Sequence, residues 1–243
     1  RRTGAFQEAE VGAALELIRA ERGEAVLDTF VDIGANIGTH SLYALSAGFR
    51  HAVCFEPSPG NFRLLRVNQI LNGVDERCRD FQVALSDREG TVAMEASPNN
   101  HGDIRVRGGD PAGAPVYGED NWSTFEVATR RLDDVLADCA LPSERVGLVW
   151  MDTQGHEAHV LAGAPRLLEA GTPFVIEFWP YGLSRAGRSE IFFDLLAASG
   201  RKIFDLGGDS PRAATIDGLR SYYRKGLEEE SSSFAAHTNL MLL

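Results

Sequence analysis

The chain has 243 residues, of which 44% are hydrophobic and 24% are charged, a balance typical of one globular domain with at most a small extension. Its 24 Lys and Arg residues against 35 Asp and Glu residues give a net charge of −11, which disfavours a general binder of nucleic acid or of anionic membranes. No apolar run approaches the roughly 20 residues that span a bilayer, and no signal peptide is visible, so we expect a cytoplasmic protein without a membrane span. The three cysteines lack metal-ligand spacing, and no metal site is expected.

The first segment has the pattern of an amphipathic helix. Residues 5–22 place apolar side chains at helical spacing, and Gly23 then ends the pattern as a C-terminal cap. We expect an N-terminal helical extension over residues 1–25, followed by a single domain over residues 26–243.

The most informative stretch is residues 30–40, where an apolar run stops at Gly34 and a helical pattern follows Gly38. This order predicts a buried strand, a tight turn and a helix. In a doubly wound sheet, such a junction lies at the carboxyl edge of the first strand, where a nucleotide-like ligand binds. Both glycines would let the backbone approach that ligand closely.

Two cofactors compete for this turn. A dinucleotide fingerprint requires G-x-G-x-x-G, whereas Asn36 holds the place of the second glycine and the third is missing. Asp32 places a carboxylate just before the turn, which suits the ammonium group of S-adenosylmethionine better than the pyrophosphate of NAD. An NAD-dependent oxidoreductase of the Rossmann type stays the alternative, as does a sharp turn without a ligand.

A second strand is predicted over residues 52–55, and it ends at Glu56. Glu56 lies 22 positions after Gly34, close to the ~20 expected of an acidic residue that binds ribose hydroxyls. A carboxylate can accept hydrogen bonds from two hydroxyls at once. A solvated glutamate at a strand end is the simpler alternative.

A helix follows, with Ser58 as its cap and Pro59 at its first position. Its apolar positions recur at helical spacing, and we expect Leu64, Val67 and Leu71 on the buried face.

The third strand is expected over residues 81–85, and an extra strand over residues 91–96 makes a hairpin-like excursion. Residues 97–123 are rich in Gly, Pro, Asn and Asp, so we interpret them as a lid over the site, with a mobile surface loop as the alternative. Arg105 and Arg107 in this segment are candidates to meet an acidic group.

Four more strands complete the pattern, over residues 146–151, 174–178, 202–206 and 239–243. Helical patterns separate most of them, so the predicted fold is α/β. It has a seven-stranded, mostly parallel sheet with helices on both faces and an inserted hairpin and loop after strand three.

Four motifs, at residues 32–38, 56–57, 84–87 and 152–157, resemble in order and spacing those of the FkbM-type methyltransferases. The resemblance implies a Rossmann-like class I methyltransferase fold, S-adenosylmethionine as the cofactor and O-methylation of a hydroxyl on a sugar, glycan or polyketide-like metabolite. The residues that this resemblance assigns to the cofactor are Asp32, Gly34, Asn36 and Gly38 for the methionine part, Glu56 for the ribose, Ala84 and Leu85 for the adenine, and Asp152 beside them. Many relatives carry Glu where this chain has Gln154, so no carboxylate role is carried over to that position.

Methylation of a hydroxyl needs a general base. His156 follows the fourth strand and is the first candidate, with a pKa expected near the unperturbed value of about 6.5. Asp152 and His101 are the next candidates. A methyltransferase-like domain that binds without turnover is the non-enzymatic alternative.

Aromatic side chains offer a surface for the acceptor. Trp122, Trp179 and Tyr181 are candidates to stack on a sugar or a macrolide, although aromatic residues more often belong to the core.

Overall fold

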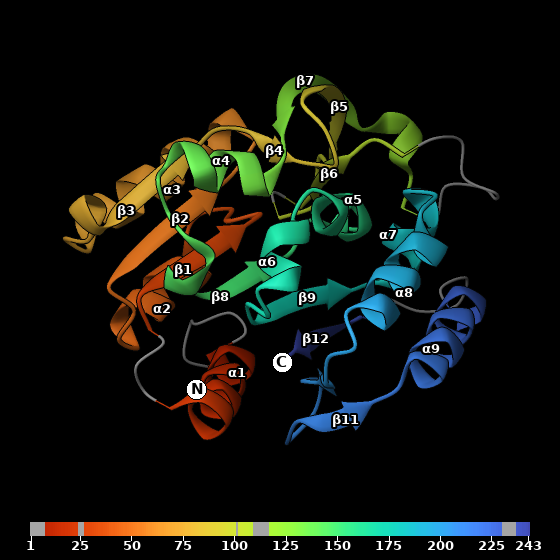
Figure 1. Ribbon diagram of the computed structural model, residues 1–243. Coiled ribbons are helices and arrows are strands. Elements are labelled where there is room, and N and C mark those ends of the chain that lie inside the picture. The colour runs from red at the N-terminus through yellow and green to blue at the C-terminus, as the bar shows by residue number, and fades with distance from the viewer. Residues whose placement is uncertain (1–7, 24–26, 101, 109–116, 230–236) are drawn as a thin grey trace.

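The computed structural model (Figure 1) describes residues 8–23, 27–100, 102–108, 117–229 and 237–243. The strands of its main sheet are β1 Thr29–Ile33, β2 His51–Phe55, β3 Cys78–Phe81, β8 Val146–Met151, β9 Phe174–Phe178, β10 Ile203–Asp205, β11 Arg212–Ala214 and β12 Thr238–Leu242. They are ordered β11-β10-β12-β9-β8-β1-β2-β3. The strands from β3 to β9 are parallel, whereas β12 is antiparallel to both of its neighbours.

The predicted α/β class with a mostly parallel sheet is confirmed, but the count of seven strands is wrong. The eighth strand is β11, a three-residue edge strand that pairs antiparallel with β10. It carries exposed residues and no apolar alternation, so its sequence gives no strand signal.

Helices cover both faces of the main sheet. One face packs against α1 Glu8–Arg22, α2 Thr39–Ser46 and α3 Pro59–Leu71, while the other packs against α4 Leu132–Asp138, α5 Glu157–Ala162, α6 Pro165–Glu169, α8 Ser189–Ala198 and α9 Ile216–Glu229. A further short helix, α7 Pro180–Arg185, follows β9. The 3₁₀ turns within the described residues are η2 Asp75–Arg77, η3 Glu119–Asn121 and η4 Ser143–Arg145. Strands covered on both faces are mostly apolar, and all five residues of β1 and β9 are buried, Asp32 and Glu177 among them.

The predicted N-terminal helix is present as α1, and it is built into the core. Val11, Ala14, Leu15 and Ile18 are buried in the same cluster as Phe30. The boundary predicted at residue 25 lies outside the described residues, so the division into an extension and a domain stays a prediction.

The predicted third strand, residues 81–85, is divided between two sheets. β3 ends at Phe81, and Ala84–Leu85 form β4, which pairs with β7 Ser123–Arg130 in a second sheet. That sheet has the order β4-β7-β5-β6, with β5 Gly90–Ala96 and β6 Ile104–Val106. An apolar run cannot show where a chain leaves one sheet for another, and this explains the error.

The interval from 97 to 123 is therefore not one long loop. It contains β6, η3 and the start of β7, while residues 101 and 109–116 lie outside the described residues. The part that the structure describes joins the second sheet to α7, since Glu119 of η3 contacts both Arg105 of β6 and Arg185 of α7 at 2.7 Å. Closure of this segment over a ligand stays a prediction.

The helix α3 begins as expected, with Pro59 at its first turn, but its buried face was assigned incorrectly. Leu65 is fully buried, whereas the predicted inward residues Leu64, Val67 and Leu71 are 52%, 48% and 77% exposed. The sequence predicts the helix correctly, but the apolar residues that it places on the buried face lie on the exposed face. None of the described helices has the length and apolar character needed to cross a membrane.

Candidate active site

The largest cavity near the predicted motifs has a volume of about 1460 Å³ and lies between the carboxyl edge of the main sheet and the second sheet. The turn after β1 and the segments after β2 and β8 contribute to its wall, as does the end of β9. Residues of the 97–122 interval line it from the other side. This is the edge at which ligands bind in doubly wound sheets.

The glycine turn after β1 is held tightly against the turn after β8. Gly34 has a φ of +79°, and a Cβ built on it would lie 1.8 Å from the backbone oxygen of Asp152. The amides of Gly34 and Ala35 both donate to the carbonyl of Phe55, at 3.0 Å each. Only glycine fits at this position, because a side chain would separate the two turns.

The same turn has few amides to offer to a phosphate. The Asn36 amide donates to Glu56 Oε2 at 2.8 Å, and the Gly38 amide donates to the carbonyl of Ala35 at 2.7 Å. With Gly34 and Ala35 also engaged, four amides of the turn already have protein acceptors. A pyrophosphate grip of the dinucleotide type needs such amides free.

Asp32 lies beneath the turn. Its Oδ2 accepts the amide of Ser41 at 3.0 Å, in the first turn of α2, and its other oxygen is buried without a hydrogen-bond partner. Burial raises the pKa of Asp32 to about 7. Asp32 and Gly38 are not among the lining residues of the cavity, so their predicted contacts with a cofactor stay predictions.

Glu56 lines the cavity at the end of β2, where sequence spacing places it. Its Oε2 accepts the Asn36 amide and its Oε1 accepts the Ser58 amide, both at 2.8 Å. The side chain is buried, and burial raises the pKa of Glu56 to about 7. Each carboxylate oxygen keeps acceptor capacity for a hydroxyl donor, because it has about two lone-pair sites.

A carboxylate–amide–carboxylate bridge lies at the ends of β8 and β9. The Nε2 of Gln154 donates to Asp152 Oδ1 at 2.7 Å and to Glu177 Oε2 at 2.9 Å. All three residues line the large cavity. Burial first, and then the charge of Asp152, raise the pKa of Glu177 well above its ordinary value.

The turn that presents this bridge is fixed by a further acid, Glu157. Glu157 is fully buried, and its Oε1 accepts the amides of Thr153 and Gly155 and the hydroxyl of Thr153, at 2.9–3.1 Å. Gly155 packs directly on Gly182 of α7, where a Cβ would lie 2.3 Å from the carbonyl carbon.

His156 follows β8 and lines the cavity, as predicted, but its pKa is not the one expected. Its Nε2 lies 3.0 Å from Ser86 Oγ, and its ring stacks on that of His159 with 4.0 Å between centroids. Burial, reinforced by His159, lowers the pKa of His156 to about 3, so the expected value near 6.5 is wrong. His101 lies outside the described residues.

The remaining predicted contacts come from β4 of the second sheet, from Trp122 before β7 and from the start of α7. Ala84 and Leu85 line the cavity from β4, and Trp122 and Trp179 contribute aromatic surface, whereas Tyr181 does not line it. The hydroxyl of Tyr181 instead donates to Glu119 at 2.6 Å. Tyr181 therefore supports the wall from behind.

Sequence reasoning missed several residues of the cavity. Glu177 was seen only as an acid at a strand end, and His40 and Asn61 were not considered, although both line the cavity. The ring of His40 lies 4.6 Å from that of Trp150. A signal for His40 existed in its position directly after the glycine turn.

Comparison with known proteins agrees with these motifs. Residues 32–192 match the methyltransferase FkbM domain. The chain is 35% identical to the 2-O-methyltransferase NoeI of Sinorhizobium fredii over 57% of this chain and 58% of that protein. It is 30% identical to the methyltransferase sdnD of Sordaria araneosa over 63% of this chain and 67% of that protein.

A third relative is the 31-O-demethyl-FK506 methyltransferase FkbM of Streptomyces tacrolimicus, 31% identical over 56% of this chain and 59% of that protein. The matches thus span somewhat more than half of the length of most of these relatives. The domain match covers about two thirds of the present chain, with the glycine turn, Glu56 and the bridge of Asp152, Gln154 and Glu177 all inside it. The chain therefore belongs to the FkbM methyltransferase family.

Proposed function

We propose that this protein transfers the methyl group of S-adenosylmethionine to a hydroxyl of a small-molecule or glycan acceptor. The observation that carries the proposal is the chemistry of the cavity wall beside the glycine turn. Four amides of that turn already donate hydrogen bonds to acceptors within the protein, and the adjoining side chains Glu56, Asp152 and Glu177 are acids. Such a wall offers few free donors to a pyrophosphate, and its acids suit a cofactor with a sulfonium and an ammonium group, whose positive charge favours their ionised form.

The residues of the cavity fit the parts of this cofactor. Glu56 would accept the ribose hydroxyls, Ala84 and Leu85 would contact the adenine, and Asn36 and Asp152 would hold the methionine part. Asp32 acts from beneath the turn, where it holds the start of α2. When bound, S-adenosylmethionine supplies an electrophilic methyl group, so the protein has only to orient the acceptor and remove its proton.

Glu177 is the general base in this proposal. Its raised pKa makes it a stronger base than an ordinary carboxylate, and a cationic cofactor nearby favours its charged form. Glu177 would accept the proton of the acceptor hydroxyl as that oxygen takes up the methyl group, and the electron pair of the broken bond would stay with the cofactor. Gln154 keeps Glu177 and Asp152 in fixed positions.

His156 is assigned a positioning role. A histidine whose pKa is about 3 is a poor proton acceptor, and its Nε2 is already engaged with Ser86. O-methylation is supported by the printed names of two relatives, which specify a 2-O and a 31-O position. The charge of −11 argues against nucleic acid as the acceptor.

The test is methyl transfer from labelled S-adenosylmethionine to a panel of hydroxylated sugars and lactones. We expect Glu177→Gln to lower turnover by roughly a hundredfold or more, with the affinity for S-adenosylhomocysteine nearly unchanged. Turnover of the wild type should rise with pH through the pKa of Glu177, because only the ionised carboxylate accepts a proton.

The variant His156→Phe keeps an aromatic ring beside His159 and serves as the comparison. Loss of turnover in His156→Phe together with full turnover in Glu177→Gln would transfer the role of base to the histidine. Cofactor binding without transfer to any member of the panel would favour a binding domain.

A further inference from the structure

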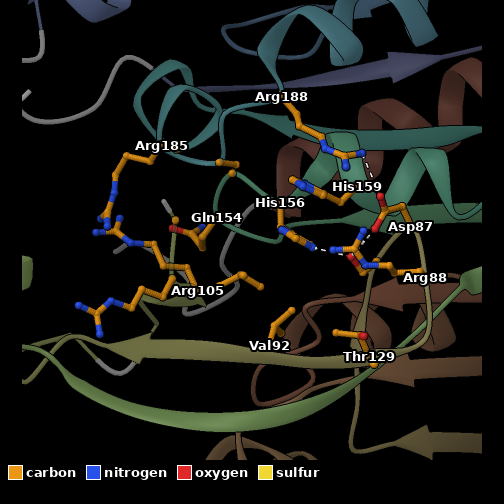
Figure 2. A pocket seen from close by; sticks show the side chains of 18 of the residues that line it. Asp87, Arg88, Val92, Arg105, Thr129, Gln154, His156, His159, Arg185 and Arg188 are labelled. Carbon is orange, nitrogen blue, oxygen red and sulfur yellow. Dashed lines mark hydrogen bonds and ion pairs between the residues drawn. The ribbon is translucent and has the colours of Figure 1, made fainter. Parts of the chain in front are cut away.

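A second, smaller cavity of about 240 Å³ adjoins the candidate active site. Val106, Gln154 and His156 line both cavities, so the two share a wall at the point where the proposed acceptor meets the bridge between Asp152 and Glu177. We call the smaller cavity the side pocket. Figure 2 shows it between Arg105 and Arg185 on one side and His156, His159 and Arg88 on the other.

The side pocket is strongly basic in a protein that is acidic overall. Five of the 24 Lys and Arg residues of the chain line it, and only one carboxylate, that of Asp87, does so among the residues that the structure describes. The five arginines are Arg88, Arg105, Arg107, Arg185 and Arg188. A positive pocket inside a chain of charge −11 requires a local explanation.

Part of this charge is already neutralised. Arg105 and Arg185 both contact Glu95 and Glu119, at 2.7–3.0 Å, and these pairs form one end wall. The guanidinium of Arg188 lies 2.9 Å from Asp87. These three arginines thus help to build the pocket, and each has an acidic partner.

Other donors in the pocket have no such partner. Within the described part of the chain, Arg88 and Arg107 have no carboxylate within ion-pair distance. Arg185 Nε and His159 Nδ1 are buried nitrogens without a hydrogen-bond partner. Arg88 and Arg107 are also exposed, so their guanidinium groups are open to a ligand that supplies acceptor oxygens.

We propose that the side pocket is an anion subsite that receives a carboxylate or phosphate group of the acceptor. The inference rests on the proposed function, because it assumes that the acceptor hydroxyl faces Glu177 in the adjoining cavity. Arginine matches the oxygens of both groups with paired hydrogen bonds, and a partly enclosed site screens the attraction less than open water does. The acceptor class is thus an acidic, hydroxylated metabolite, such as a sugar acid or a sugar phosphate.

The positive charge of the side pocket affects the pKa of the neighbouring His159. Burial first, and then the charge of Arg188, lower the pKa of His159 to about 4. An anion in the pocket would offset the charge of Arg188 and accept a hydrogen bond from the ring. The stacked pair of His156 and His159 then forms the floor on which the anion rests.

The first test uses inorganic phosphate and acetate as probes. Each is titrated into the full chain saturated with S-adenosylhomocysteine, at constant pH, while the side-chain NMR signals of His159 and Arg185 Nε are followed. Saturable shifts of these signals by either anion are expected, and the anion that binds more tightly identifies the preferred group. No saturable shift with either anion would overturn the proposal.

Two matched variants make the result specific. In Arg88→Gln/Arg107→Gln we expect the dissociation constant of the bound anion to rise at least tenfold. Arg50→Gln/Arg224→Gln removes the same charge from exposed positions outside the pocket. In this variant the dissociation constant of the anion should stay within twofold of the wild-type value. Equal weakening in both variants would mean that only the overall charge matters, and this would also overturn the proposal.

A second test separates this proposal from the proposed function. Glucuronate and glucose differ by one carboxylate, and in the presence of S-adenosylhomocysteine glucuronate should bind at least tenfold more tightly, with the difference lost in Arg88→Gln/Arg107→Gln. Equal binding of the two sugars overturns the anion subsite. Absence of S-adenosylhomocysteine binding, measured first, overturns the proposed function, and phosphate or acetate shifts at His159 then still report on the pocket by themselves.

Discussion

Glu56 and Glu157 are both buried carboxylates with a pKa of about 7, yet the structure gives them different tasks. Glu56 faces the large cavity, whereas Glu157 accepts three hydrogen bonds from the turn that precedes it. Burial is the largest cause of the raised pKa in both. A perturbed pKa alone therefore does not identify a ligand-binding residue, and exposure to the cavity has to be considered with it.

The contribution of Glu56 is measured by removing its carboxylate. Glu56→Ala should weaken binding of S-adenosylhomocysteine by about 1–3 kcal/mol, because the ribose hydroxyls lose a charged acceptor. Isothermal calorimetry measures the change, with Glu144→Ala as a control at an exposed glutamate. A folded Glu56→Ala protein with the wild-type dissociation constant would leave Glu56 as a support of the turn only.

The role of Glu157 is measured by the pH dependence of stability. Its pKa is raised from 4.5 to about 7 in the folded protein, so between these values the native state holds a proton that the unfolded state has released. The contribution of Glu157 to stability is therefore lost as pH rises through this window. Urea unfolding without cofactor should show a smaller loss between pH 5 and pH 8 in Glu157→Gln than in the wild type. Parallel pH profiles in the two proteins would contradict this account.

Single residues also show what sequence reasoning can and cannot reach. Glu56 was found from spacing, because an acid about 20 residues after a glycine turn has a recurrent geometry. The pKa of His156 could not be predicted from the sequence, because it depends on burial and on the neighbouring ring of His159. Both depend on how the chain folds and not on a sequence motif. The bridge from Gln154 to Glu177 joins two strands and becomes visible only in the fold.

At the scale of elements, the site is a contact between two turns. The turns after β1 and β8 meet where Gly34 packs on the backbone of Asp152, and Gly155 packs on Gly182 of α7. These close approaches position the acids of the cavity wall. The order of strands and helices predicted these two turns, since both follow buried apolar runs.

Gly34→Ala tests this contact. The new Cβ meets the Asp152 carbonyl, and the φ of +79° is unfavourable for alanine, so the free energy of unfolding should fall by about 2–4 kcal/mol. Gly73→Ala is the matched control, because its φ is +65° but no atom lies within 4 Å of the new Cβ, so it should cost about 1 kcal/mol or less. Denaturant unfolding compares the two variants, and equal losses would mean that the turn contact contributes nothing.

The sequence predicts elements less well where neighbouring elements decide how a strand pairs or which face of a helix is buried. The run over residues 81–85 is apolar except for Gln82, but Phe81 pairs with β2 while Ala84 and Leu85 pair with β7. The stripe of α3 has correct helical spacing, yet Leu64 and Leu71 face outward. Periodicity finds an element, and only tertiary packing decides which neighbour or face it takes.

At the scale of the whole molecule, charge is distributed unevenly, and this unevenness is the basis of the functional account. The net charge of −11 disfavours a polyanionic partner, but it gives no sign that acids gather at the large cavity or arginines at the side pocket. An acidic wall favours a cationic cofactor, and a basic pocket beside it favours an anionic acceptor. In our proposal, the two adjoining cavities hold ligands of opposite charge.

The most direct test of this account is calorimetric titration of the wild-type chain with S-adenosylmethionine, S-adenosylhomocysteine and NAD under one set of conditions. The acidic wall and the engaged amides of the turn predict saturable binding of the first two and no measurable binding of NAD. Tight binding of NAD, with none of S-adenosylmethionine or S-adenosylhomocysteine, would contradict the account.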